Sequence, residues 1–161
     1  MENGKAVRSW YGLVATLCSL SCYSRMPGTI GSMAACVVWL AFKGIPMWVI
    51  LLTAAVGCVA ADKYEKACGR EDPGECVIDE VVGYWLSAYG FGMHFAVVAL
   101  FAFRIIDIVK PFPVSRADKV HGGFGIMLDD IVGGIIVNLL LRALYWLFYG
   151  GGMQTVAGIL R

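Results

Sequence analysis

Long apolar stretches, separated by polar segments or short turns, make up most of the chain. The apolar stretches are Trp10–Tyr23, Ile30–Phe42, Ile45–Ala61, Val81–Tyr89, Met93–Phe103 and Ile131–Tyr149. Apolar and polar residues alternate for only a few positions at a time, whereas long apolar runs bounded by Gly and Pro are typical of helices. The pattern therefore predicts an all-α fold, a compact multi-helix bundle that forms a single domain over residues 1–161.

Two short turns determine on which side of the bundle the polar segments emerge. Residues 43–46 (Lys-Gly-Ile-Pro) and 90–92 (Gly-Phe-Gly) interrupt the apolar pattern with residues that stop helices. If each forms a hairpin, the polar segments 24–29, 62–80 and 104–130 lie on one side. These segments contain every acidic residue except Glu2 and most of the Lys and Arg residues. The positive-inside rule places that side in the cytoplasm.

The composition moves the prediction toward a membrane. Hydrophobic residues make up 59% of the chain and charged residues 16%, against about 45–50% and about 25% in an average soluble domain. A net charge of +1 argues against a nucleic-acid partner. A spanning helix needs about 20 apolar residues, a length that only Ile131–Tyr149 approaches. We therefore predict a bundle embedded in or associated with a membrane, with a soluble bundle as the alternative.

Two short segments share the same order of residue types. Residues 79–83 (Asp-Glu-Val-Val-Gly) and 129–133 (Asp-Asp-Ile-Val-Gly) are each predicted to open an apolar helix. Helix capping would explain a single acidic doublet. Two such helices that cross at their glycines would bring four carboxylates together, which requires a cation. Oxygen ligands without His or Cys point to Mg²⁺, with Mn²⁺ or Ca²⁺ as alternatives.

A helix face with charges of both signs lies between the two doublets. Arg104, Asp107 and Lys110 are spaced three residues apart, and Pro111 ends their helix. An ion pair at an amphipathic helix end would explain this spacing without any function. Beside the acidic doublets, we interpret Asp107 as a further metal-directed carboxylate and the two basic residues as phosphate-binding cations.

Two glycine-containing segments precede apolar helices. In residues 27–32 (Pro-Gly-Thr-Ile-Gly-Ser), Thr29 is predicted to be the N-cap of a helix whose first N–H groups suit a phosphate. Residues 121–125 (His-Gly-Gly-Phe-Gly) lead into the second doublet in the same manner. His121 is either a proton donor or a bystander in a loop. Neither segment specifies a function by itself.

Together, these motifs resemble the phosphatidylglycerophosphatase A family from residue 25 to residue 142. The resemblance is carried by residues 27–32, by Asp72-Pro73-Gly74 leading to residues 78–83, by residues 103–113 and by residues 121–134. It implies a Mg²⁺-dependent enzyme of the bacterial inner membrane that hydrolyses phosphatidylglycerophosphate to phosphatidylglycerol and inorganic phosphate. Its partner would be an anionic phospholipid in the bilayer, and its active site would face the cytoplasm.

The resemblance and the residue chemistry together assign roles. The carboxylates expected to hold Mg²⁺ are Asp79, Glu80, Asp107, Asp129 and Asp130. Arg104 and Lys110 would neutralise phosphate oxygens, and Thr29 would help to fix the phosphate. Asp72 or Asp79 would accept a proton from water. Attack by water and attack by an Asp through a covalent intermediate both remain open.

A basic loop is expected to attract lipid, and two other functions are also compatible with the sequence. Lys110, Arg116 and Lys119 form a basic loop that would attract anionic lipid at about 1 kcal/mol per charge. One rival function is a small membrane cation carrier, since intramembrane acids mark cation pathways. The other is a non-catalytic helical membrane subunit whose acidic residues only cap helices.

Overall fold

The structure, a computed structural model, describes residues 3–117 and 120–149, and every regular element in these ranges is helical. The predicted all-α fold is therefore confirmed. The elements are α1 (Asn3–Arg8), α2 (Trp10–Ala15), the 3-10 turn η1 (Ser21–Tyr23), α3 (Pro27–Phe42), α4 (Met47–Cys68), α5 (Ile78–Ala88), α6 (Met93–Val109), α7 (Val114–Ala117) and α8 (Gly122–Tyr149).

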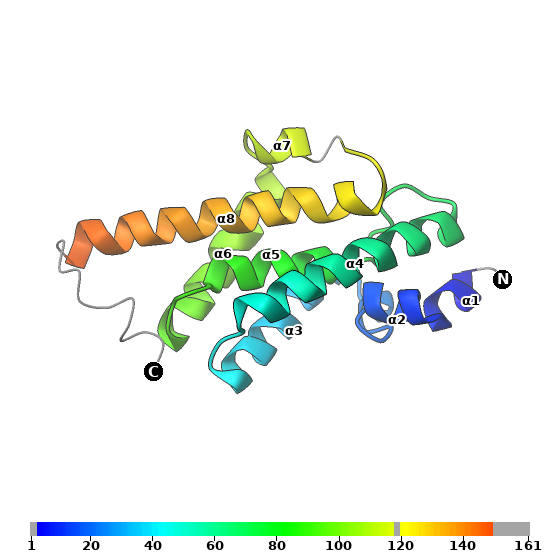
Figure 1. Ribbon diagram of the computed structural model, residues 1–161, viewed down its shortest axis with the longest axis horizontal. Coiled ribbons are helices and arrows are strands. Elements are labelled where there is room, and N and C mark those ends of the chain that lie inside the picture. The colour runs from blue at the N-terminus through cyan, green and yellow to red at the C-terminus, as the bar shows by residue number, and fades with distance from the viewer. Residues whose placement is uncertain (1–2, 118–119, 150–161) are drawn as a thin grey trace.

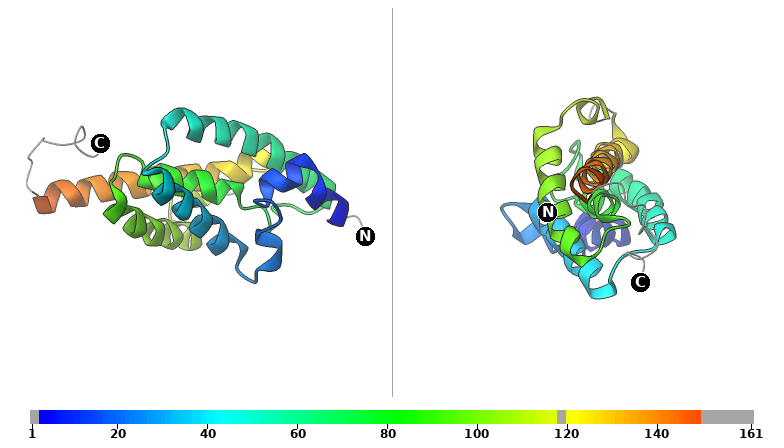
Figure 2. Two further views of the ribbon diagram at one scale, coloured as in Figure 1. Left: turned by 90° about the horizontal axis from the view of Figure 1, so that it is seen from below. Right: turned by 90° about the vertical axis from the view of Figure 1, so that its left-hand side faces the viewer.

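Helix α5 lies at the centre of the bundle, in contact with α3, α4, α6 and α8 (Figures 1 and 2). Most of its side chains are buried. The Tyr84 hydroxyl donates to the backbone oxygen of Ala96 on α6 at 3.2 Å, and Trp85 Nε1 donates to that of Ala35 on α3 at 3.0 Å. These bonds satisfy the polar atoms of large buried side chains, so they fix α5 between its neighbours.

Helices α5 and α8 cross at two glycines, with their backbones in contact. A Cβ atom on Gly83 would lie 2.7 Å from the backbone oxygen of Asp130, and a Cβ atom on Gly134 would overlap the backbone oxygen of Gly83. Two helices can approach this closely only where no side chain intervenes. The predicted crossing at glycines is thus confirmed, although Gly134, next to the Gly133 of the repeated motif, makes the contact. The crossing places the two acidic doublets on adjoining helices.

The polar residues within the apolar part of α8 hold the other end of α5. Asn138 Nδ2 donates to the backbone oxygens of Leu86, Ser87 and Tyr89 at 2.8–3.1 Å. Arg142 Nη2 donates to the Tyr89 oxygen at 3.1 Å, and its Nε donates to Asn138 Oδ1 at 2.7 Å. Because the last carbonyls of a helix have no partner within it, these side chains act as its C-terminal cap.

The start of α8 differs from the prediction. The helix begins at Gly122, so Asp129 and Asp130 lie within a helix, whereas Asp79 and Glu80 lie in the first turn of α5 as predicted. Gly123 packs directly on the α4 backbone, where an added Cβ would lie 2.6 Å from Asp62 Cβ. This close packing allows a glycine-rich segment of low helix propensity to continue the helix.

The apolar run led us to expect one helix over Trp10–Tyr23, but the structure divides this stretch. Helix α2 ends at Ala15, and Leu17, Cys18 and Ser19 have positive φ angles. The Thr16 hydroxyl donates to the Gly12 oxygen and accepts from the Ser19 N–H. A side chain that bonds the local backbone in this way competes with the helix.

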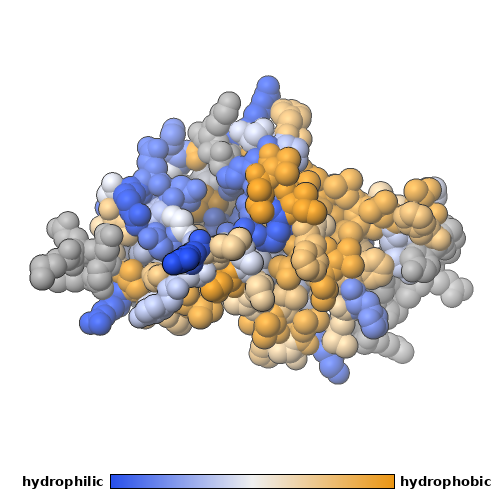
Figure 3. Space-filling model, turned by 180° about the vertical axis from the view of Figure 1, so that it is seen from behind, coloured by the Kyte–Doolittle hydropathy of each residue, from blue (hydrophilic) through white to orange (hydrophobic). Residues whose placement is uncertain are grey.

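One face of the bundle has a mainly polar part and a mainly apolar part. The N-terminal ends of α3, α5 and α8 lie toward one side, and the turns after α3 and α5 lie toward the other (Figure 1). On the face shown in Figure 3, hydrophilic residues gather mainly in one half and hydrophobic residues mainly in the other. By length and composition, Met47–Cys68 and Gly122–Phe148 could each cross a membrane. This division is typical of a membrane protein.

The helix crossing can be tested by adding one methyl group at neighbouring positions. Gly134→Ala places a Cβ on the Gly83 carbonyl, so we expect the free energy of unfolding to fall by about 1–3 kcal/mol. Gly133→Ala is the matched control, because its Cβ would meet Ile106 at an ordinary 3.5 Å. We expect this control to be neutral or slightly stabilising. Thermal unfolding of the detergent-solubilised chain, followed by circular dichroism, measures both, and equal shifts would contradict the proposed crossing.

Candidate active site

Acidic side chains from three helices gather where α5 and α8 cross. Asp79 and Glu80 start α5, Asp107 lies near the end of α6, and Asp129 and Asp130 lie on α8. The residues are close enough for their charges to interact: Asp79 with Glu80 and Asp129, and Glu80 with Asp107. The structure therefore brings together all five carboxylates that were predicted to face a metal. Whether they hold one stays a prediction.

Burial makes these carboxylates unusual. Asp129 and Asp130 are only 7% and 3% exposed. Burial, followed by the charges of Glu80, Asp72 and Asp129, raises the pKa of Asp79 well above its ordinary value. Burial also raises the pKa of Glu80, to about 8, against the opposing effect of Arg104. Without a cation, the site therefore favours the protonated form of these two carboxyl groups.

Three oxygens in the cluster are buried without a hydrogen-bond partner among the described residues: Asp79 Oδ1, Glu80 Oε2 and Asp130 Oδ2. An unsatisfied buried polar atom costs about 1–3 kcal/mol, and a charged one costs more. These atoms come from both acidic doublets. They are the oxygens that a bound cation would satisfy.

Two basic residues from α6 and its end bind the cluster. Arg104 Nη1 lies 2.6 Å from Asp107 Oδ2 and 3.2 Å from Glu80 Oε1. Lys110 Nζ lies 2.8 Å from Asp129 Oδ2. Lys110 follows the last residue of α6, as the position of Pro111 predicts. Each predicted phosphate-binding cation is thus at the site, already paired with a carboxylate.

The start of α3 packs directly on Glu80. A Cβ on Gly31 would lie 2.6 Å from Glu80 Oε2, and a Cβ on Gly28 would overlap Glu80 Oε1. Ser32, which the sequence analysis did not single out, donates to the Gly28 oxygen at 2.9 Å and lies 3.5 Å from Arg104 Nη1. The signal in the sequence that could have identified Ser32 was its place in the Pro27–Ser32 motif. Small residues here leave room for the carboxylate.

The predicted N-cap role of Thr29 is wrong. Helix α3 begins at Pro27 with Met26 at the N-cap, and Thr29 lies within the first turn. The fixed φ angle of proline suits the first helical position, where its missing N–H costs nothing. Thr29 nevertheless lies next to Gly28, at the edge of the acidic cluster, so a contact with phosphate stays a prediction.

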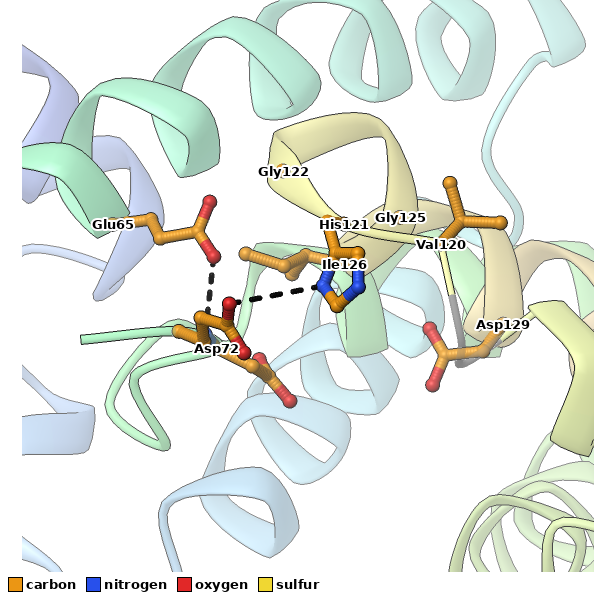
Figure 4. A pocket seen from close by; sticks show the side chains of 9 residues that line it. Glu65, Asp72, Val120, His121, Gly122, Gly125, Ile126 and Asp129 are labelled. Atoms are coloured by element: carbon orange, nitrogen blue, oxygen red, sulfur yellow. Dashed lines mark hydrogen bonds and ion pairs between the residues drawn. The ribbon is translucent and has the colours of Figure 1, made fainter.

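A pocket of about 120 Å³ adjoins the cluster at Asp129. In Figure 4, Glu65 and Asp72 lie on one side of the pocket, Asp129 on the other, and His121 between them. The Asp72 N–H donates to Glu65 Oε1 at 3.3 Å. His121 Nδ1 lies 3.8 Å from Glu71 Oε1, an ion pair only when the imidazole is protonated. The structure thus places Asp72 and His121 at the open side of the site.

The donor set, made of carboxylate oxygens, fits a hard divalent cation. Among residues 3–117 and 120–149, no three His, Cys, Asp or Glu side chains converge as ligands of one ion. Mg²⁺ is commonly bound through one or two carboxylates, several waters and the phosphate of a substrate. The oxygens without a partner among the described residues and the mutual repulsion of the carboxylates fit such a site, and metal binding stays a prediction.

Comparison with known proteins identifies relatives over most of the chain. The profile of the family described as Phosphatidylglycerophosphatase A matches residues 13–145. The chain is 36% identical over 120 residues to Phosphatidylglycerophosphatase A of Escherichia coli, covering 69% of each chain. It is 34% identical over 131 residues to that of Haemophilus influenzae, covering 75% of this chain and 80% of the relative. No solved structure matches the chain.

A third relative carries a different substrate in its name. The chain is 36% identical over 134 residues to a Bacteroides thetaiotaomicron protein whose proposed activity is that of a phosphatidylinositol-3-phosphatase. The match covers 74% of this chain and 84% of the relative. Since the family profile spans most of the sequence and includes every residue of the acidic cluster, the chain belongs to the phosphatidylglycerophosphatase A family.

Proposed function

We propose that this chain removes the terminal phosphate of phosphatidylglycerophosphate in a Mg²⁺-dependent reaction, on the cytoplasmic side of the bacterial inner membrane. As a member of its family, the chain is a hydrolase that acts on a phosphate monoester in phospholipid biosynthesis. The observation that carries the proposal is the acidic cluster, with its unpartnered oxygens next to Arg104 and Lys110. Buried carboxylates with paired cations are the groups that bind a metal and a phosphate together.

Each residue has a distinct task in the proposed reaction. Mg²⁺, when bound by Asp79, Glu80, Asp107, Asp129 or Asp130, supplies Lewis-acid polarisation of the phosphate. Arg104 and Lys110 neutralise its other oxygens, and Thr29 lies at the start of α3 to help to orient it. Asp72 is better placed than Asp79 to take a proton from water, because it is exposed and lines the pocket. His121 shares that pocket and can protonate the leaving oxygen.

The rival functions explain less of the structure. A cation carrier needs polar groups along its membrane crossing, yet Asn138 and Arg142 are engaged in capping α5. A helix-capping subunit needs its acids at helix starts, yet Asp129 and Asp130 lie within α8. Hydrolysis uses the whole cluster. The substrate named for the Bacteroides relative makes phosphatidylinositol 3-phosphate the second lipid to test.

Replacing the most buried acid separates catalysis from folding. We expect Asp130→Asn to lower phosphate release from phosphatidylglycerophosphate by about two orders of magnitude or more. Its stability should be unchanged or higher, because a buried charge without a partner is removed. Colorimetric phosphate release and thermal unfolding measure the two effects. Glu75→Gln is the control, since Glu75 pairs with Arg70 at the surface, and near-normal activity of Asp130→Asn would refute the site.

The raised pKa of Glu80 predicts how stability depends on pH and metal. Between its ordinary value of 4.5 and its folded pKa of about 8, Glu80 keeps a proton in the folded state that the unfolded chain has released. The free energy of unfolding without metal should therefore fall as the pH rises through this window. Mg²⁺ favours the ionised carboxylates, so it should raise the melting temperature more at pH 8 than at pH 6.

Melting curves at the two pH values, with EDTA or with Mg²⁺, test this expectation without any substrate. The Asp130→Asn variant should show a smaller metal-dependent increase. A melting temperature that is independent of Mg²⁺ at both pH values would argue against the metal part of the proposal. Activity that persists in EDTA would do the same, while leaving the phosphatase assignment intact.

A further inference from the structure

The outer face of α6 stays hydrophobic along the whole helix, including the end that carries the site. Val97, Phe101, Ile105 and Ile108 are exposed and follow one another at helical spacing. Helix α6 has 17 residues, which corresponds to a length of about 25 Å. An exposed apolar face of this length matches most of a bilayer's hydrocarbon thickness of about 30 Å.

This hydrophobic face continues past the site itself. Val109 and Phe112 flank Lys110 in the sequence and are 66% and 71% exposed. Lys110 binds Asp129, so the acidic cluster adjoins the apolar surface at this residue. A site that faced only water would have no reason to be edged with large apolar side chains.

Arg116, an exposed cation of the predicted basic loop, lies at the edge of these apolar side chains. The Arg116 guanidinium lies 5.0 Å from the centre of the Phe112 ring, a cation–π contact. Of the predicted basic loop, Lys110 is engaged with Asp129, and Lys119 lies outside the described residues. Arg116 is therefore the residue of this loop that the structure presents at the surface. Its planar guanidinium suits a phosphate.

We propose that Ile108, Val109, Phe112 and Arg116 form a docking surface for anionic lipid, through which the site takes its substrate from the bilayer. The apolar side chains would lie against the acyl chains, and Arg116 would bind the phosphodiester. This proposal rests on the proposed function. In phosphatidylglycerophosphate, a glycerol separates the phosphodiester, which Arg116 would bind, from the terminal monoester, which Lys110 would bind. The chemistry of the patch, apolar with one cation at its rim, matches an anionic bilayer surface.

Two exposed phenylalanines at different places in the fold provide a matched test. The variants are Phe112→Ser and Phe42→Ser, whose side chains are 71% and 74% exposed in the native chain. Both are reconstituted in mixed micelles with phosphatidylglycerophosphate at varied surface concentration. We expect Phe112→Ser to raise the interfacial KM about tenfold with kcat unchanged, while Phe42→Ser changes neither.

The charged part of the surface is tested with Arg116→Gln. We expect its interfacial KM to rise about fivefold at low ionic strength, and the difference from the native chain to shrink in high salt. Replacement of the zwitterionic carrier lipid by phosphatidylglycerol should favour binding of the native chain more than that of Arg116→Gln.

Several outcomes would overturn the docking surface. If Phe112→Ser matches Phe42→Ser in KM, the surface does not bind lipid, although native phosphate release still supports the proposed function. If Phe112→Ser lowers kcat and the melting temperature instead, its role is structural. If it changes the oligomeric state in detergent while KM is unchanged, the face contacts a second copy of the chain. Absence of phosphate release by the native chain would refute the proposed function itself.

Discussion

The backbone contact between α5 and α8 is the constraint on which the rest of the site depends. Gly83 and Gly134 allow the two helices to touch, and each glycine follows one of the acidic doublets along the chain. Any side chain at the crossing would push the helices apart and separate the carboxylates. The carboxylates are buried there because α3 and α6 also pack against α5. Close packing and charge crowding therefore have one structural cause.

The two doublets look alike in sequence but differ in their electrostatic surroundings. Asp79 and Glu80 lie in the first turn of α5, where the helix dipole favours negative charge. Asp129 is paired with Lys110. Asp130 lies within α8, away from a helix start, and one of its oxygens has no partner among the described residues. Of these carboxylates, Asp130 therefore depends most on a charge that the protein itself does not supply.

The sequence predicted those features that depend on local residue order. Apolar runs predicted the helices, and Pro111 predicted the end of α6. The repeated acid–Gly pattern predicted that two helices cross at glycines, although Gly134 rather than Gly133 of that pattern makes the contact. It failed where tertiary packing overrides local preference. Gly123 is a poor helix former, yet contact with α4 extends α8 upstream of Asp129. Thr29 is a good N-cap, yet the N-cap is Met26, three residues earlier, and the helix starts at Pro27. Ser32 was missed because its contact with Arg104 joins residues 72 positions apart.

The active site of a phosphatase that acts on a lipid has to be accessible both to water and to the bilayer. The pocket at Asp72, His121 and Asp129 is open and polar, so it can supply water and accept released phosphate. The end of α6 is apolar and exposed. The ion pair between Lys110 and Asp129 connects the pocket with this apolar end, since Lys110 follows the apolar helix and Asp129 lines the pocket. A substrate held at this pair would have its phosphate toward water and its chains toward lipid, which explains why a strongly acidic cluster is built so close to a hydrophobic surface.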